Sequence, residues 1–119
     1  MRFFHSQFAL ICQGTEATQG ILLDMSKINK IYFNHVAFLR MRKLRLLKIF
    51  HSDRRSKCEV AIHRQKSDLR FLPNSLRYLF WEGYPWKSFP TRFRPENLVE
   101  LHLPHSNVER LWEGNQVNK

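Results

Sequence analysis

One spacing of apolar residues recurs four times along this chain, and it limits the fold more than any other feature. In each copy, two apolar residues stand two positions apart, and a hydroxyl-bearing residue follows three positions later. The copies are Ile21–Ser26, Leu47–Ser52, Leu79–Tyr84 and Leu101–Ser106. A leucine also stands three residues before the last three copies, at Leu44, Leu76 and Leu98. An internal repeat of this kind predicts structural units that stack on one another.

The distances between the copies fit a known repeat class. Corresponding apolar residues are separated by 26, 32 and 22 residues. The pattern fits the leucine-rich-repeat template, whose units are about 20–29 residues long, with Ser or Tyr where Asn or Cys usually stands. Three units also have apolar residues two and five positions after the hydroxyl, namely Ile28 and Ile31, Trp86 and Phe89, and Val108 and Leu111. In the second unit these positions are Arg54 and Lys57.

The repeat predicts an α/β fold, a leucine-rich-repeat solenoid with short parallel strands and irregular, 3-10 or helical returns. Alternate side chains of a strand point to opposite faces, so the apolar pair of each copy points inward. Strands are expected near 21–24, 46–50, 77–81 and 99–103. A short helix is expected over His35–Met41, with Asn34 as its N-cap. One alternative stays open, because Met41–Phe50 also suits an amphipathic helix with a basic face.

The chain is expected to have three parts. Residues 1–13 form an atypical N-terminal tail, residues 14–43 a linker-like first unit with the short helix, and residues 44–119 the leucine-rich repeats. The second unit is long, so residues 53–65 are expected to loop out of the stack as a basic insertion. The last unit leaves Leu111 and Trp112 without a neighbour, which predicts marginal stability or self-association.

Charge and cysteine content limit the partners and the compartment. Twenty Lys and Arg face ten Asp and Glu, a formal net charge of +10. This charge attracts polyanions or an acidic protein surface, although a piece of a larger protein can show the same imbalance. Cys12 and Cys58 are too few for a disulfide framework, and the apolar run Phe8–Cys12 is too short for a secretion signal. We expect a location in the cytoplasm, with the nucleus as the alternative, and no membrane span.

Longer strings of residues resemble one family. From Gly14 to Gln116 the chain is similar to the start of the repeat region in plant intracellular immune receptors of the TIR, nucleotide-binding, leucine-rich-repeat type. The resemblance is carried by Gly14–Ala17, Gly20–Lys27, Ala37–Phe38, Met41, Leu44–Lys48, Leu76–Leu79, Trp81–Pro85, Lys87–Pro90, Pro95–Leu101 and Val108–Gly114. It implies a non-catalytic protein-interaction role in plant defence signalling.

The chain also departs from that family. These 119 residues contain neither the TIR domain nor the nucleotide-binding domain of such receptors, and they contain no G-x-x-x-x-G-K-[ST] phosphate loop. Residues 1–13 are unlike the domain that precedes Gly14 in the family. The sequence is therefore expected to be a truncated receptor, and an inactive truncation product is one of the alternatives.

Few residues are suited to catalysis or metal binding. His51, Cys58 and His63 are separated by seven and five residues, which does not match zinc modules, and a fourth ligand is not evident. We interpret them as solvated residues of the insertion. Catalysis by a Cys-His pair would need a spatial convergence that the sequence does not indicate. We expect no enzymatic activity, no cofactor and no metal.

A dense basic stretch supports a rival function, which is non-specific binding of nucleic acid or another polyanion. Its members are Arg40, Arg42, Lys43, Arg45, Arg54, Arg55 and Lys57. A phosphate backbone attracts such a cluster without sequence preference. However, the chain has no nucleic-acid-reading motif, and the repeat explains the leucines between the basic residues. A solvated face is therefore the preferred interpretation.

The repeat also predicts a protein-binding surface, because the strands of a solenoid line a concave face where partners dock. The outward positions are Lys48, Phe50, Tyr78, Phe80, Glu82, Glu100, His102 and His105. Exposed aromatic residues suit an interface, since they provide large contact areas in desolvated pockets. Trp81 and Trp112 are assigned to the core or to a capping position. The resemblance implies that this surface contacts a receptor's nucleotide-binding domain or a pathogen effector.

Overall fold

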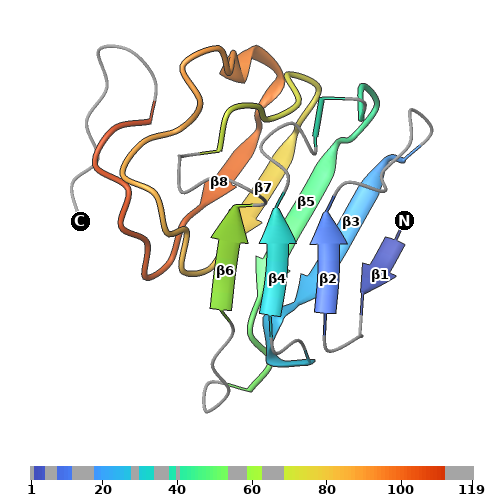
Figure 1. Ribbon diagram of the computed structural model, residues 1–119. Helices are drawn as coiled ribbons and strands as arrows, with labels where there is room; N and C mark the ends of the chain where they lie inside the picture. Colours follow the sequence, from blue (N-terminus) through green and yellow to red (C-terminus); the bar gives the residue numbers. More distant parts are fainter. Residues whose placement is uncertain are drawn as a thin grey trace.

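Two parallel β-sheets form the body of this computed structural model, which describes residues 2–4, 8–11, 18–27, 30–33, 38–39, 41–53, 59–62 and 69–111 (Figure 1). The larger sheet, in spatial order, consists of Arg2–Phe4 (β1), Gly20–Asp24 (β3), Leu46–Phe50 (β5), Tyr78–Trp81 (β7) and Glu100–His102 (β8). The smaller sheet consists of Phe8–Ile11 (β2), Lys30–Phe33 (β4) and Glu59–Ile62 (β6). Two short 3-10 helices are Met25–Lys27 (η1) and Pro95–Asn97 (η2).

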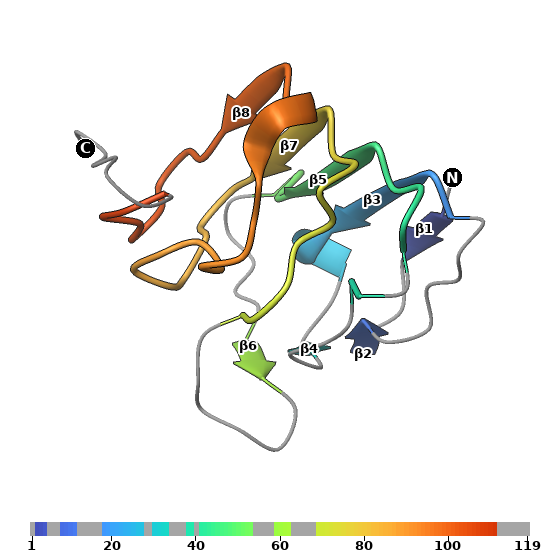
Figure 2. The same cartoon turned by 90° about the horizontal axis from the view of Figure 1, so that it is seen from above.

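The chain winds as a coil, because consecutive strands from β1 to β7 alternate between the two sheets. All paired strands within each sheet are parallel. Seen from above, the two sheets form two layers (Figure 2). Each of the first three turns therefore contributes one strand to each sheet, and successive turns stack side by side.

The register of the larger sheet confirms the repeat. Ile21 lies opposite Leu47, Leu47 opposite Leu79, and Leu79 opposite Leu101. These separations are the 26, 32 and 22 residues of the sequence pattern. The four predicted strands are confirmed as β3, β5, β7 and β8, and the alternative of a helix over Met41–Phe50 is wrong, because β5 takes up its second half.

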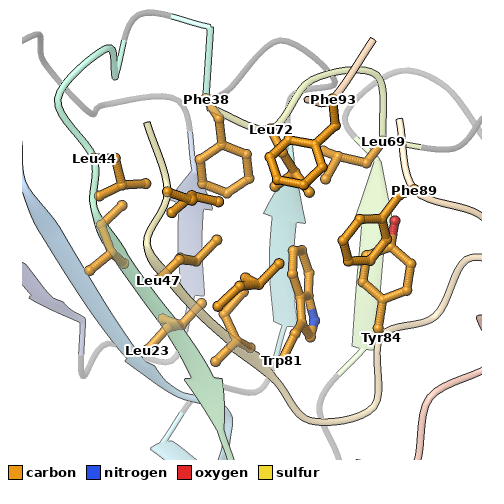
Figure 3. Close-up of a cluster of buried hydrophobic side chains, with 14 of the residues drawn as sticks. Leu23, Phe38, Leu44, Leu47, Leu69, Leu72, Trp81, Tyr84, Phe89 and Phe93 are labelled. Carbon is orange, nitrogen blue, oxygen red and sulfur yellow. The ribbon is translucent and has the colours of Figure 1, made fainter. Parts of the chain in front are cut away.

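The inward residues of the repeat form the core (Figure 3). Leu47 and Ile49 of β5 and Leu79 of β7 are at most 1% exposed, and Leu44 and Leu76 are completely buried. Burying one such side chain stabilises the fold by about 1.5–3 kcal/mol relative to leaving it exposed. The leucine spacing therefore predicts the core because every turn contributes side chains to the same layer.

Aromatic rings fill the part of the core on the inner side of β7. The ring of Tyr84 lies 5.0 Å from that of Trp81 and 5.1 Å from that of Phe89, centroid to centroid. Tyr84 is fully buried, and its hydroxyl donates a hydrogen bond of 2.8 Å to the carbonyl oxygen of Ser88. The prediction of Trp81 in the core is confirmed, since it is 1% exposed. Trp112 lies outside the described residues.

The anchors predicted after the hydroxyl position are confirmed in the last two units. Phe89 and Val108 are buried, while Trp86 and Leu111 are partly buried and pack against the core. The backbones of the two units pair here as well, through a parallel bridge between Ser88 and Arg110. The return side of the coil is therefore held together by the same residues that the repeat pattern singled out.

Asp24 joins two turns of the coil, at the ends of β3 and β5. Its Oδ1 accepts hydrogen bonds from the backbone N–H groups of Ser26 (2.9 Å) and Ser52 (3.1 Å), and its Oδ2 accepts one from the Ser52 hydroxyl (2.6 Å). Burial raises the pKa of Asp24, but these hydrogen bonds from Ser52 and Ser26 outweigh it and hold the pKa below its ordinary value of 3.8. Two hydroxyl positions of the repeat are thus fixed by one carboxylate.

The N-terminal tail expected over residues 1–13 contains two strands. β1 pairs with β3 and β2 pairs with β4, so this segment adds one strand to each sheet. The leucine pattern does not extend into it, and for that reason another turn was not predicted there.

The basic insertion expected over residues 53–65 does not simply loop out of the stack. Its residues 59–62 are β6, which pairs in parallel with β4 through Lys30 opposite Glu59 and Phe33 opposite Ile62. The returns of the first three turns are thus strands, where the sequence predicted irregular, 3-10 or helical segments. A run such as Glu59-Val60-Ala61-Ile62 has β-branched residues that suit a strand, but it lacks the leucine spacing of the repeat.

The short helix expected over His35–Met41 falls largely outside the described residues, which include Phe38, Leu39 and Met41. Phe38 and Leu39 lie in a turn, and the N–H of Met41 donates to the carbonyl of Phe38 over 3.1 Å. Phe38 and Met41 are each 1% exposed, so both side chains belong to the core. Among the residues that the structure describes, no helix has the length and apolar character needed to cross a membrane.

Candidate functional site

The face of the larger sheet that points away from the core carries the candidate site, which we call the outer face. Residues of β5 alternate along the strand, with Leu47 and Ile49 buried and Leu46, Lys48 and Phe50 partly exposed. This alternation follows from the two-residue period of a strand, and β7 shows it too. The outer face displays Lys48, Phe50, Tyr78, Phe80, Glu82, Glu100, His102 and His105, all partly or fully exposed.

A row of side chains crosses the strands in the middle of the outer face. Lys48 of β5 lies opposite Phe80 of β7, and Phe80 lies opposite His102 of β8. The Lys48 Nζ is 5.1 Å from the centroid of the Phe80 ring and 5.3 Å from that of Phe50. A cation at this distance from a ring face is attracted by about 0.5–1 kcal/mol at an exposed site. Lys48 is therefore held over two aromatic rings.

His102 extends this row into an aromatic cluster. Its ring centroid lies 5.8 Å from that of Tyr78 and 5.9 Å from that of Phe80. Its Nε2 is 3.2 Å from Oε2 of Glu100, and the two side chains are 50% and 57% exposed. A contact this exposed contributes little to stability, so both groups are available to a partner. The cluster thus combines aromatic area with groups that can exchange hydrogen bonds.

Glu82 has a structural contact in addition to its place on the outer face. Its Oε1 accepts a hydrogen bond of 3.0 Å from the backbone N–H of His51 and lies 3.7 Å from the His51 Nδ1. The Glu82 side chain is 18% exposed. Its carboxylate therefore joins the ends of β5 and β7, and only part of it faces solvent.

A hollow of about 470 Å³ opens beside the carboxyl ends of β7 and β8. Phe80, Glu82, His102 and His105 contribute to its wall. His105 has a backbone φ of 55°, in the left-handed region that residues other than glycine seldom adopt. The hollow gives the outer face a recess next to its aromatic cluster.

Two outer-face positions were missed in the sequence. Leu22 of β3 lies opposite Lys48, and Leu46 of β5 lies opposite Tyr78, and both side chains are partly exposed. Both stand at outward positions of the predicted alternation, which is the signal that could have identified them. They extend the apolar area of the face toward the N-terminal turns.

The residues suggested for polyanion binding divide into two groups. Arg42, Lys43 and Arg45 are exposed, in the segment that leads into β5. Arg40, Arg54, Arg55 and Lys57 lie outside the described residues. The structure therefore brings three of these seven basic residues onto one exposed segment.

The metal candidates His51, Cys58 and His63 are placed by the structure only in part, because Cys58 and His63 lie outside the described residues. His51 Nδ1 is buried and has no hydrogen-bond partner. The described part of the chain contains no group of three or more His, Cys, Asp or Glu side chains arranged to hold a metal ion.

Comparison with known proteins gives a consistent set of relatives. The family model described as "Leucine Rich Repeat" matches residues 97–116. Disease resistance-like protein DSC1 of Arabidopsis thaliana is 44% identical over 102 residues, which cover 84% of this chain and 8% of that protein. Disease resistance protein RPP2A of the same plant is 43% identical over 101 residues, covering 85% of this chain and 7% of that protein.

A third relative from Arabidopsis thaliana agrees with these two. Disease resistance-like protein CSA1 is 40% identical over 107 residues, which cover 87% of this chain and 9% of that protein. The chain thus spans less than a tenth of the length of these relatives. No solved structure matches it.

Proposed function

Because the chain belongs to the leucine-rich-repeat region of plant disease resistance proteins, we propose that it is a non-catalytic segment that binds a protein through its outer face. The cluster of Lys48, Phe50, Tyr78, Phe80 and His102 carries this proposal. Binding energy in protein interfaces concentrates in a few aromatic and cationic residues at the centre of a contact. The cluster offers such residues on three neighbouring strands.

The partner in this proposal is the nucleotide-binding domain of an immune receptor. In the family that the sequence resembles, the nucleotide-binding domain directly precedes the repeats. The outer face would therefore contact a domain that acts in the same pathway of plant defence. A pathogen effector is the alternative protein partner. We propose that the chain functions in the cytoplasm or the nucleus.

The proposal is tested by titrating a recombinant nucleotide-binding domain from such a receptor into the whole chain in a calorimeter. Replacing Tyr78 and Phe80 by alanine is expected to weaken binding about tenfold or more, since truncating an interface hot spot costs about 2 kcal/mol or more. Glu109→Ala is the control, because Glu109 is exposed, lies outside the larger sheet and lines none of the hollows.

Each result of this titration has a definite meaning. Weaker binding of the Tyr78 and Phe80 variant, with Glu109→Ala unchanged, supports the outer face as the binding surface. Equal affinity of all three proteins contradicts it. If the domain does not bind at all, the proposed partner is wrong, and an effector remains to be tested in the same way.

Polyanion binding is a second candidate, supported by the exposed side chains of Arg42, Lys43 and Arg45. Binding to heparin and to duplex DNA across a salt series tests it. A steep fall in affinity with salt, reduced by replacing these three residues with glutamine, would support this function in place of the first one. If neither the domain nor the polyanions bind, both of these candidate functions are wrong.

A further inference from the structure

Two hollows lie side by side on another surface of the molecule, beside the segments that lead into β7 and β8. One has a volume of about 590 Å³ and is lined in part by Ser88, Phe89, Pro90 and Thr91. The other, of about 220 Å³, is lined in part by Leu39 and Phe93. Arg70, Phe71 and Arg92 contribute to both hollows. These three residues therefore form a ridge between the two recesses.

The ridge carries two guanidinium groups and no opposing carboxylate. Arg70 and Arg92 are both exposed, and the described residues that line either hollow include no Asp or Glu. Within the described part of the chain, neither arginine side chain makes an ion pair, and Ser88 and Thr91 add hydroxyl groups at the wall of the larger hollow. Among the described residues, no carboxylate therefore neutralises the positive charge of this ridge.

The chemistry of the ridge suits a carboxylate that arrives on a partner. The planar guanidinium group of arginine matches a carboxylate with two parallel hydrogen bonds, which fixes orientation as well as contributing energy. Apolar side chains line the recesses on both sides, with Phe71, Phe89 and Pro90 around the larger one and Leu39 at the smaller one. An acidic residue flanked by apolar residues would place its carboxylate on the ridge and its neighbours in the hollows.

We propose that the Arg70–Phe71–Arg92 ridge is a binding site for an acidic segment of a partner protein, in which carboxylates alternate with apolar or aromatic side chains. The two recesses, each lined in part by apolar side chains, favour a protein segment over a nucleic acid, because phosphate binding alone needs cations but no recesses for side chains. This site is separate from the outer face, so its test does not depend on the function proposed above.

The test uses the whole chain and a fluorescent acidic peptide in which glutamates alternate with phenylalanines. Fluorescence anisotropy measures its affinity for the wild type and for a variant with Arg70→Gln and Arg92→Gln. The double variant is expected to bind about tenfold more weakly or worse, because two charge-assisted contacts are lost. The control variant, Lys87→Gln with Arg110→Gln, removes the same charge from exposed residues that line neither hollow, and it is expected to keep the wild-type affinity within about twofold.

Two further probes separate this site from general charge attraction. A peptide with glutamine in place of glutamate is expected not to bind. In NMR spectra, the Nε–Hε signals of Arg70 and Arg92 are expected to shift when the acidic peptide is added and to stay unchanged when the glutamine peptide is added. Equal losses in both double variants would overturn the proposal. Tighter binding of a single-stranded oligonucleotide of equal charge, or unchanged arginine signals, would also overturn it.

Discussion

Asp24 shows how a single side chain can hold successive turns of the coil together. Its carboxylate accepts hydrogen bonds from Ser26 in its own turn and from Ser52 in the next. The sequence pattern indicated the serines as a repeated hydroxyl position, but it did not indicate their partner. Asp24 occupies an outward position of β3, and only the three-dimensional structure shows that it is buried over the strand ends.

Replacing Asp24 with asparagine is expected to lower the free energy of unfolding by roughly 1–3 kcal/mol, because a buried hydrogen-bonded group is left partly unsatisfied. The amide keeps one acceptor oxygen, but its nitrogen cannot accept the hydrogen bond from the Ser52 hydroxyl. Denaturant unfolding at pH 7 measures the loss. Glu109→Gln, which removes an equal charge from an exposed position, is the control and is expected to change little.

The same carboxylate predicts a dependence of stability on acid. The folded-state pKa of Asp24 lies below the ordinary value of 3.8, so its contribution is complete above that value. As the pH falls below 3.8 and through the lower folded-state pKa, the contribution is lost. The unfolding free energy of the wild type should therefore approach that of Asp24→Asn at low pH, and a constant gap between them from pH 7 to pH 2 would contradict this account.

Tyr84 takes the hydroxyl position of the third unit, and its own hydroxyl donates to the Ser88 carbonyl. Tyr84→Phe is expected to cost about 1 kcal/mol, the net value of one such hydrogen bond, while the ring stays in the aromatic core. Tyr78→Phe removes a hydroxyl from the partly exposed outer face and should cost less. Thermal unfolding of the two variants compares them, and equal melting temperatures would show that the buried hydrogen bond contributes nothing.

At the scale of the strands, the sequence predicted the larger sheet better than the smaller one. The positions of β3, β5, β7 and β8 and their register follow from leucines that must point to one side of a strand. The smaller sheet lacks such a periodic signal, because the sequences of its short strands would suit a loop equally well. The strand β1 was missed for the same reason, because its Arg2-Phe3-Phe4 sequence contains no leucine.

The alternation within one strand can be tested with two adjacent residues. Leu79→Ala is expected to lower the free energy of unfolding by about 2–5 kcal/mol, because this side chain is completely buried. Phe80→Ala should cost about 1 kcal/mol or less, since it removes a partly exposed ring with one cation contact. Urea unfolding measures both. A larger loss for Phe80 than for Leu79 would mean that the strand faces the other way.

The whole molecule is a stack in which each turn contacts its neighbours, so stability should be close to a sum over turns. Residues 1–13 supply β1 and β2, which add to both sheets. Deleting these residues is therefore expected to remove about a fifth of the unfolding free energy, as the loss of one turn in five. Circular dichroism during urea unfolding measures the change, and an unaltered midpoint would mean that the segment is a tail after all.

The candidate site at this scale was predictable to the extent that it depends on the repeat. The outward positions from Lys48 to His102 follow from the strand period alone. The contact of Lys48 with Phe80, the contact of Glu82 with His51 and the ridge of Arg70 and Arg92 depend on how neighbouring turns are placed. Such contacts join residues from different units, and the spacing within one unit carries no information about them.

Site-specific photo-crosslinking tests the central claim most directly, which is that the outer face binds a protein. A photoreactive phenylalanine analogue replaces Phe80 in one sample and the exposed Glu109 in the other, and each is illuminated with a receptor's nucleotide-binding domain. We expect a covalent adduct from position 80 and none from position 109. An adduct from position 109 alone, or none from either position at concentrations where the domain binds, would contradict the assignment of the outer face.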